Sequence, residues 1–257
     1  MKVLILAGGY GSRLGNITDS IPKPMVEIGG KPIIWHIMKS YAHYGLTEFV
    51  LLTGYKSNVI KNYFVNYNYY NSHFTLDLKA HTTNFLTNVD EDWKVTILDT
   101  GLENLKGSRI KQSEPFIDDD INLITYGDGV CDIDINKLLA FHKSHGKTVT
   151  MTGVKPPSRF GELNLEGDRV ASFEEKPQVS SAGYINGGYM VFNRSMYDKL
   201  LLDPNCDFEF GPLEELAKMG EVMVYKHDGF WECVDTERDL SYLNKLWNTN
   251  KATWKKW

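Results

Sequence analysis

The sequence predicts an α/β fold in which a Rossmann-like, mixed but mostly parallel sheet is flanked by helices and carries a small antiparallel extension. The first observation is a continuous aliphatic run at Val3–Ala7, which is typical of a strand covered on both faces. The second is that such runs alternate with segments in which apolar residues recur at helical spacing. The third is a change after Gly146, where the pattern favours antiparallel strands.

In the first part of the chain, Gly29-Gly30-Lys31-Pro32 predicts a turn followed by proline at a first helical position. Apolar residues then follow at helical spacing until Gly45. The same reasoning predicts strands at 49–53, 74–79, 95–98 and 121–125, and helices at 58–66 and from the cap Asp134 to Gly146. Residues 67–92 are rich in Tyr and Asn and poorly periodic, and we interpret them as a loop or lid that reaches a neighbouring subunit.

Beyond residue 146 the predicted elements are strands at 148–154, 184–192 and 222–226, a hairpin over 163–173, short helices at 196–202 and 213–219, and a closing helix at 236–247. The hairpin turns at Gly167-Asp168. No repeat or linker interrupts the pattern. We therefore expect one domain over residues 1–257, with halves at 1–146 and 147–257 and with the C-terminal helix in the second half.

Composition excludes several classes of protein. The 257 residues are 42% hydrophobic and 24% charged, which is ordinary for a folded globule, and the net charge of −5 argues against a nucleic-acid or anionic-membrane surface. No apolar run has the length of a membrane span, and no cleavable segment precedes the first strand, so a cytoplasmic location is expected. The three cysteines are widely spaced and lack a CxxC pair, which predicts inert thiols.

A glycine-rich turn follows the first strand and is close in sequence to two cations. Gly8, Gly9 and Gly11 allow the backbone to approach an anion and to adopt positive φ, so that successive N–H groups converge on phosphate oxygens. Arg13 and Lys23 would supply positive charge. The alternative is a strand-to-helix turn with two solvated cations, which a lone glycine loop supports about equally well.

Two aspartates are candidate metal ligands. Asp128 follows a buried strand at the sheet edge where α/β proteins bind ligands, and Asp235 is its possible partner. Two carboxylates together with substrate phosphates would suit Mg²⁺. The alternatives are a solvated turn for Asp128 and a helix N-cap before Thr236 for Asp235. The glycine spacing, GxGxxxG, departs from the dinucleotide fingerprint, and no GxxxxGK[ST] loop is present.

The chain resembles the sugar-1-phosphate nucleotidyltransferases. Six motifs occur in that family's order: LAGGYGSRL from residue 6, PKPM from 22, YGDG from 126, EKP from 175, NGG from 186 and VDT from 234. Nearly the whole chain is covered, and the likeness is strongest to members that use CTP and glucose 1-phosphate. Ser12 stands where the family usually has threonine, which keeps the hydroxyl. Residues 102–108, near the expected base pocket, are less typical.

The resemblance implies that CMP passes from CTP to α-D-glucose 1-phosphate by direct Mg²⁺-assisted in-line displacement, giving CDP-glucose and pyrophosphate. Residues 1–146 would then bind the nucleotide and 147–257 the sugar. The alternatives are dTTP or UTP, another phosphorylated acceptor, or a binding module without turnover. The implied catalytic residues are Arg13, on the β- and γ-phosphates, and Lys23, on the α-phosphate. The remaining implied sites are Leu6, Ala7, Gly8, Gly9, Gly11, Ser12 and Asp128 for the nucleotide, Glu175, Lys176, Asn186 and Gly187 for the sugar phosphate, and Asp128 and Asp235 for the metal. Within the nucleotide site, we expect Arg109 and the segment 99–101, with Thr100, on the side of the base.

Purely structural roles remain possible for the residues on the sugar side. Lys176-Pro177 would also suit the end of an exposed hairpin, and Asn186 would also suit a satisfied residue at a β-bulge beside two glycines. The tail tryptophans Trp247, Trp254 and Trp257 are too many for a free surface, so we expect them to pack on the body or on another subunit. A homo-oligomer and a role in surface-polysaccharide synthesis are implied by the family.

Overall fold

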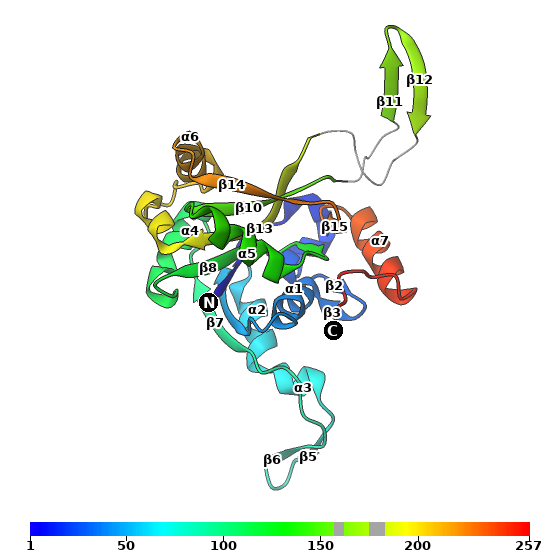
Figure 1. Cartoon of the computed structure of the whole chain (residues 1–257). Coiled ribbons are helices and arrows are strands. Elements are labelled where there is room, and N and C mark those ends of the chain that lie inside the picture. The colour runs from blue at the N-terminus through cyan, green and yellow to red at the C-terminus, as the bar shows by residue number, and fades with distance from the viewer. Residues whose placement is uncertain (157–161, 175–182) are drawn as a thin grey trace.

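In the computed structural model, which describes residues 1–156, 162–174 and 183–257, a seven-stranded sheet forms the centre of the molecule (Figure 1). The strand order is β14-β10-β13-β8-β1-β4-β7. These strands are β1 (Val3–Ala7), β4 (Glu48–Thr53), β7 (Lys94–Asp99), β8 (Ile121–Tyr126), β10 (Val149–Val154), β13 (Ile185–Asn193) and β14 (Val222–His227). Strands from both halves of the chain thus share one sheet.

All neighbours in this sheet pair in parallel except β13, which runs antiparallel to both β8 and β10. The predicted mixed, mostly parallel sheet is therefore confirmed. Because β1 has β4 on one side and β8 on the other, the strand order reverses direction at β1. In open α/β sheets a crevice forms at such a reversal, beyond the carboxyl ends of the strands.

Helices cover both faces of the sheet. Along β1, Val3, Ile5 and Ala7 pack on one core cluster and Leu4 on the other, as expected of a strand buried on both sides. The first cluster includes residues of α1 (Ile33–Ala42), α2 (Ser57–Val65), α5 (Ile135–His145) and α7 (Glu237–Asn248). The second includes residues of α4 (Lys106–Gln112), α6 (Glu214–Lys218) and the 3₁₀ turn Arg194–Lys199.

Most predicted helix ends are confirmed. The Asp134 side chain accepts a hydrogen bond from Lys137 N, and Gly146 adopts the left-handed conformation after α5. Pro32 was expected at the first helical position, but it pairs with Glu27 in the short β2–β3 ribbon (Glu27–Ile28 and Lys31–Pro32) and lies just outside α1. A helix was expected at 196–202, but the chain there forms a 3₁₀ turn that ends at Lys199, and Leu200 is already extended.

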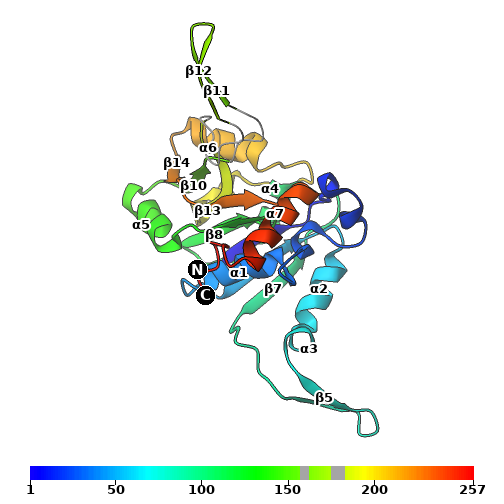
Figure 2. The same ribbon diagram turned by 90° about the vertical axis from the view of Figure 1, so that its right-hand side faces the viewer.

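Two hairpins project from the body in opposite directions (Figures 1 and 2). The predicted hairpin at 163–173 is confirmed as β11 (Glu162–Glu166) and β12 (Arg169–Glu174), with Gly167 at positive φ in the turn. The strand expected at 74–79 is one arm of the other hairpin, β5 (Phe74–Asp77) and β6 (Thr82–Phe85), which follows the short helix α3 (Tyr67–Asn71). Several large apolar side chains on this projection are exposed: Tyr69, Tyr70, Phe74, Leu76, Leu78 and Leu86.

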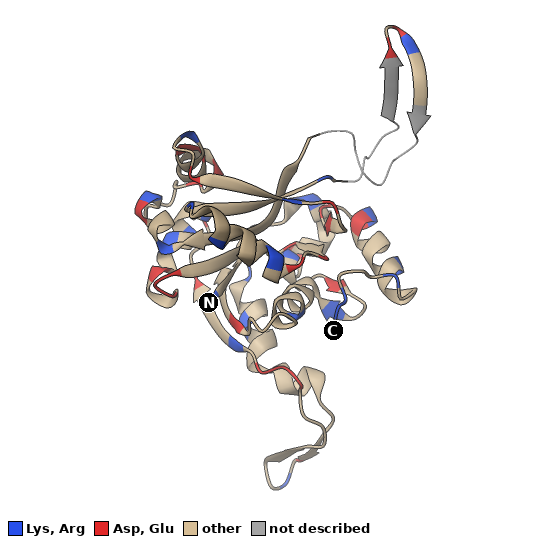
Figure 3. Ribbon diagram, in the orientation of Figure 1, with Lys and Arg blue, Asp and Glu red and all other residues tan. Residues whose placement is uncertain are grey.

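The C-terminal tail packs on the body, as its tryptophans predict. Trp254 is only 1% exposed and belongs to the first core cluster, and Trp247 and Trp257 pack against that cluster. The Trp254 indole donates a hydrogen bond to Nδ1 of His36, whose pKa burial lowers to about 4. Within the described ranges, no helix combines the length and the apolar character that crossing a membrane requires. Lysines and arginines are interspersed with aspartates and glutamates over the described elements (Figure 3).

Candidate active site

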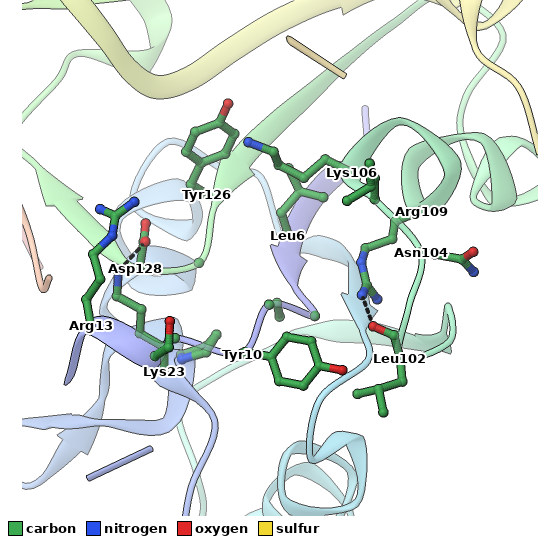
Figure 4. Close-up of a pocket in the computed structure, with 18 of the residues that line it drawn as sticks. Leu6, Tyr10, Arg13, Lys23, Leu102, Asn104, Lys106, Arg109, Tyr126 and Asp128 are labelled. Carbon is green, nitrogen blue, oxygen red and sulfur yellow. Dashed lines mark hydrogen bonds and ion pairs between the residues drawn. The ribbon is translucent and has the colours of Figure 1, made fainter. Parts of the chain in front are cut away.

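A cavity of about 540 Å³ opens at the carboxyl ends of β1 and β8 (Figure 4). Its volume is in the range of small-molecule sites. The predicted site residues that line it come from the glycine turn, from the two candidate cations, from Arg109 and from both aspartates. They are Leu6, Ala7, Gly8, Gly9, Gly11, Ser12, Arg13, Lys23, Arg109, Asp128 and Asp235.

At two positions of the glycine turn, Gly8 and Gly11, the structure requires a glycine, for a different reason at each. Gly11 has φ of +67°, which L side chains rarely adopt, and it directly precedes the 3₁₀ turn Ser12–Asp19. A Cβ on Gly8 would lie 2.3 Å from Nη1 of Arg109, so this glycine lets a buried arginine pass beneath the turn. By contrast, a Cβ on Gly9 would meet no atom within 4 Å. The structure therefore leaves the space beside Gly9 open.

Lys23 lies between the two candidate metal ligands. Its ammonium group donates to Oδ2 of Asp128 and to Oδ1 of Asp235, at 2.7 Å in each case, and its side chain is 11% exposed. Burial alone would lower the pKa of Lys23, but the two carboxylates outweigh it and raise the pKa above its ordinary value. The two carboxylates thus converge on one cation.

Arg13 completes this group from the solvent side. Its Nη1 donates to Oδ2 of Asp235 at 2.8 Å while the side chain stays 76% exposed. Burial alone would raise the pKa of Asp235, but Lys23 and Arg13 together hold it below its ordinary value. Asp235 is therefore a charged member of the site.

The proposed alternative for Asp235, a helix N-cap, is wrong. Thr236 caps α7: its hydroxyl accepts from Asp239 N, and Oδ2 of Asp239 accepts from Thr236 N at 2.8 Å. This reciprocal pair is a capping box. Because Thr236 carries the cap, the Asp235 carboxylate is left to bind Lys23 and Arg13.

On the expected base side, Arg109 is buried and binds backbone. The residue is 5% exposed, and its guanidinium donates to the carbonyl oxygens of Thr53, Gly101 and Leu102 and to the hydroxyl of Thr100. The Thr100 hydroxyl in turn donates to Thr53 O at 2.6 Å, and its side chain does not line the cavity. Thr100 and most donors of Arg109 therefore hold the loop after β7 in place.

The expected sugar side is only partly described. Glu175 and Lys176 lie outside the described residues. Asn186 donates through Nδ2 to the Tyr126 hydroxyl at 3.1 Å and accepts from Gly188 N at 2.8 Å, so its amide oxygen and one of its N–H groups are bound within the protein. The carbonyl oxygen of Gly187 accepts a hydrogen bond from the Trp231 indole. Neither Asn186 nor Gly187 lines the cavity itself, but Tyr126 does.

Sequence reasoning missed a polar group on this wall of the cavity. Lys106 begins α4, forms an ion pair with Glu209 and lies 5.2 Å from the Tyr126 ring centroid. The Tyr126 hydroxyl also donates to Glu209. The α4 segment is short and weakly patterned, so only its place next to the expected base loop could have drawn attention to Lys106. Figure 4 shows Lys106 and Tyr126 side by side, across the cavity from Tyr10.

Tyr10 and Glu103 bridge the cavity mouth. The Tyr10 hydroxyl donates to Oε1 of Glu103 at 2.8 Å, which joins the glycine turn to the loop after β7. Leu102, Asn104 and Leu105 of the same loop also line the cavity. One wall of the site therefore carries Arg13, Lys23 and the two aspartates, and the opposite wall combines loop backbone and aliphatic side chains with the polar residues Glu103, Asn104, Lys106 and Arg109.

Comparisons with known proteins give one family. The family model described as nucleotidyl transferase matches residues 2–247. The chain is 46% identical over 258 residues to a glucose-1-phosphate cytidylyltransferase of Salmonella typhi, and 44% identical over 257 residues to a probable glucose-1-phosphate cytidylyltransferase of Bacillus subtilis (strain 168), with complete coverage of both chains in each case. Among solved structures, HddC from Yersinia pseudotuberculosis complexed with GMP-PN is similar in fold, with a TM-score of 0.68, 23% identity, and coverage of 96% of this chain and 99% of that one.

Proposed function

Because the chain belongs to the nucleotidyl transferase family, we propose that it transfers CMP from CTP to α-D-glucose 1-phosphate and releases pyrophosphate. A phosphate oxygen of the sugar phosphate would form a bond to the α-phosphorus of CTP as the bond from that phosphorus to the pyrophosphate oxygen breaks. The product is CDP-glucose. Both relatives named above match this chain from end to end and carry the corresponding name.

The observation that carries the proposal is the arrangement of four charged side chains beside the glycine turn. Lys23 lies 2.7 Å from a carboxylate oxygen of Asp128 and of Asp235, and Arg13 lies 2.8 Å from the latter. Nucleotidyl transfer needs aligned reactants and neutralised charge rather than a protein nucleophile. A turn with open space at Gly9 and two cations beside it supplies both requirements.

In this proposal Lys23 stabilises the charge that develops at the α-phosphate, and Arg13 binds the β- and γ-phosphates. Lys23 is held in position from two sides, so little reorganisation is needed when phosphate oxygens replace its carboxylate partners. Arg13 is largely exposed and can follow the triphosphate as it enters. Ser12 and the backbone of the glycine turn would bind the nucleotide.

Asp128 and Asp235 fit a magnesium site. Their oxygens already surround a single cation, and carboxylate oxygens are the hard ligands that Mg²⁺ prefers. Bound there with the substrate phosphates, Mg²⁺ would neutralise negative charge on the phosphate oxygens. The two aspartates would hold it.

The proposal is tested by pyrophosphate release with glucose 1-phosphate, Mg²⁺ and each NTP in turn. Release with CTP, and CDP-glucose as the product, is the expected result. Release with only dTTP or UTP would show that the nucleotide substrate is not CTP. Release only with a different sugar phosphate would show that the acceptor is not glucose 1-phosphate. No release with any pair would favour a binding module and contradict the transferase proposal.

The metal assignment has its own test. In Asp128→Asn we expect activity to be lost together with its dependence on Mg²⁺, because one of two anionic ligands becomes neutral. Asp134→Asn is the matched control, since Asp134 caps α5 and does not line the cavity. An Asp128→Asn variant with full activity and an unchanged Mg²⁺ response would remove Asp128 from the metal site.

We also propose that Glu175, Lys176, Asn186 and Gly187 bind the sugar phosphate, with Asn186 acting next to Tyr126. The chain would work in the cytoplasm, in the synthesis of CDP-sugars for surface polysaccharide. A homo-oligomer is supported by the exposed apolar side chains of the projecting β5–β6 hairpin, since such side chains on one projection often mark a protein contact. Light scattering of wild type and of Leu76→Ser tests this: a monomeric wild type would contradict it.

A further inference from the structure

A short two-stranded ribbon carries both candidate metal ligands at one end. Its strands are β9 (Gly129–Cys131) and β15 (Trp231–Cys233), which pair antiparallel with Gly129 opposite Cys233. Asp128 directly precedes β9, and a single residue, Val234, separates β15 from Asp235. The backbone near these aspartates is closed by a hydrogen bond of 2.8 Å from Val234 N to Asp128 O. The separation of the two carboxylates therefore depends on how this ribbon is held.

The ribbon is separate from the seven-stranded sheet and has only three paired positions. An isolated two-stranded ribbon is marginally stable at best, so contacts at its ends and sides decide its geometry. From the side, Gly129 O accepts from the Tyr189 hydroxyl, and the Trp231 indole donates to Gly187 O at 2.8 Å. The second contact links the ribbon to the β13 segment that also bears Asn186.

The far end of the ribbon is closed by Asp132 and His227. Nε2 of His227, at the end of β14, lies 3.0 Å from Oδ1 of Asp132, and Asp132 N donates to Phe230 O at 3.1 Å. Burial alone would raise the pKa of Asp132, but the hydrogen bond with His227 helps to keep it below its ordinary value, so the carboxylate is charged. Lys256 donates to the Asp132 carbonyl from the C-terminal tail.

The chain passes so close to this pair that position 229 has no room for a side chain. A Cβ on Gly229 would lie 2.5 Å from Oδ1 of Asp132 and 2.6 Å from Cε1 of His227. The edge strand β14, the ribbon and the C-terminal tail thus meet at one residue, Asp132: His227 binds its carboxylate and Lys256 its backbone carbonyl. This density of contacts indicates that the turn from β14 into β15 is fixed here.

We propose that Asp132 and His227 are positioning residues, which set the separation of Asp128 and Asp235 from the far end of the β9–β15 ribbon. The inference rests on the proposed function, because the two aspartates matter only if they bind a metal–nucleotide complex. Asp132 is four residues from Asp128, a span of about 13 Å along a strand. Over so short a span, a displacement of the backbone at Asp132 would also displace the backbone at Asp128.

A metal site would be the rival interpretation of the same residues. Cys131, Asp132 and His227 offer three ligand atoms within 4.8 Å of one another. However, the His227 nitrogen is already hydrogen-bonded to Asp132, and burial raises the pKa of the Cys131 thiol, which opposes the thiolate that metals bind. The geometry therefore favours a hydrogen-bonded pair.

The experiment compares Asp132→Ala and His227→Ala with Glu221→Ala. Glu221 precedes the opposite end of β14 and binds Lys147 and Thr148, so it is a contact of the same edge strand away from the ribbon. In both ribbon variants we expect the Mg²⁺ concentration for half-maximal activity to rise about tenfold, the lower range for outer-shell partners of a metal. The KM for CTP should change less than twofold, and the double variant should be no worse than either single one. Glu221→Ala should leave the Mg²⁺ response unchanged.

A second measurement does not use activity. Hydrogen exchange of a peptide over residues 230–236 should show faster exchange of the Val234 amide in His227→Ala and wild-type protection in Glu221→Ala. Folded ribbon variants with a wild-type Mg²⁺ midpoint and a protected Val234 amide would overturn the proposal. So would a rise of Tm with Zn²⁺ in wild type that Cys131→Ser abolishes. Wild type that turns over no nucleotide would defeat the proposed function, whereas the exchange result would still decide the positioning role.

Discussion

The two walls of the cavity use their buried cations in opposite ways. On one wall, Lys23 faces the cavity with two carboxylates as its partners. On the other, the guanidinium of Arg109 donates to three backbone carbonyls and one hydroxyl, and no direct ion pair between Arg109 and a carboxylate is found among the described residues. Lys23 thus belongs to a cluster of charges that can rearrange around a ligand. Arg109, also a buried cation, belongs instead to the fixed framework of the loop.

The difference teaches how to assign roles to cations in a phosphate-binding site. A carboxylate partner can be exchanged for a phosphate, because both offer anionic oxygens that accept charge-assisted hydrogen bonds from an ammonium group. Carbonyl oxygens of a loop cannot be given up without leaving buried acceptors unpaired, which costs about 1–3 kcal/mol for each group. Lys23 is therefore expected to act on the ligand and Arg109 mainly on the loop.

The largest expected effect is on turnover and comes from Lys23→Ala. We expect kcat to fall by roughly 10²–10³, the usual scale for removing one preorganised charge-stabilising group. Pyrophosphate release under saturating substrates measures it. Lys39→Ala is the control, because Lys39 is also a partly buried lysine paired with a carboxylate, Glu91, but does not line the cavity. A change confined to KM would assign Lys23 to ground-state binding.

The next effect is on stability and comes from Arg109→Ala. Removing the guanidinium leaves three carbonyl acceptors without this donor, so we expect the free energy of unfolding to fall by about 2–4 kcal/mol. Urea unfolding measures it, with Arg13→Ala as the control because Arg13 is mostly exposed. An Arg109→Ala variant that keeps wild-type stability and loses only nucleotide affinity would show that Arg109, like Lys23, acts on the ligand. That result would contradict the different roles assigned to the two cations.

A smaller effect is on the pH dependence of the free energy of unfolding, which should differ between variants of the two walls. Because the folded-state pKa of Asp235 is lowered, its contribution to stability is complete above the ordinary aspartate pKa of about 4 and is lost as pH falls through the folded value. Unfolding free energies between about pH 6 and pH 3 should therefore fall less steeply in Asp235→Asn than in wild type, while Arg109→Ala keeps the wild-type slope. Identical slopes for Asp235→Asn and wild type would contradict the pairing.

The smallest effect tests the support of the charged wall. Thr236→Ala removes the cap of α7 next to Asp235, and we expect a loss of about 1 kcal/mol in unfolding free energy, with Thr236→Ser near wild type. Urea unfolding gives both values. If Thr236→Ala matched wild type, the capping box would not support this end of α7.

Sequence reasoning placed the glycine turn, Lys23, Asp128 and Asp235 because each follows a strand or a motif whose geometry is local. It could not separate Asp235 from a helix cap, because Asp and Thr are both good caps and stand side by side; only the bond between Thr236 and Asp239 decides. It placed Thr100 with the nucleotide, whereas the structure turns that hydroxyl toward Arg109.

What the sequence could not predict is long-range contact. Lys106 and Glu209 are 103 positions apart, and nothing in either segment indicates that they pair beside Tyr126. The same holds for Asp132 and His227, which are 95 positions apart. The hairpin β5–β6 was half predicted, because the Tyr- and Asn-rich stretch has little hydrophobic alternation to mark its second strand.

The position of the first strand constrains how the chain can fold. β1 pairs with β4, which is synthesised soon afterwards, and with β8, which follows more than 100 residues later. The core cluster on one face of β1 also includes Trp254, near the end of the sequence. A nascent chain that stops before β8 would present an apolar, unpaired strand edge, which is an aggregation hazard. Truncations at either terminus should therefore yield insoluble fragments rather than half-size domains, and refolding should be slow for a protein of this length.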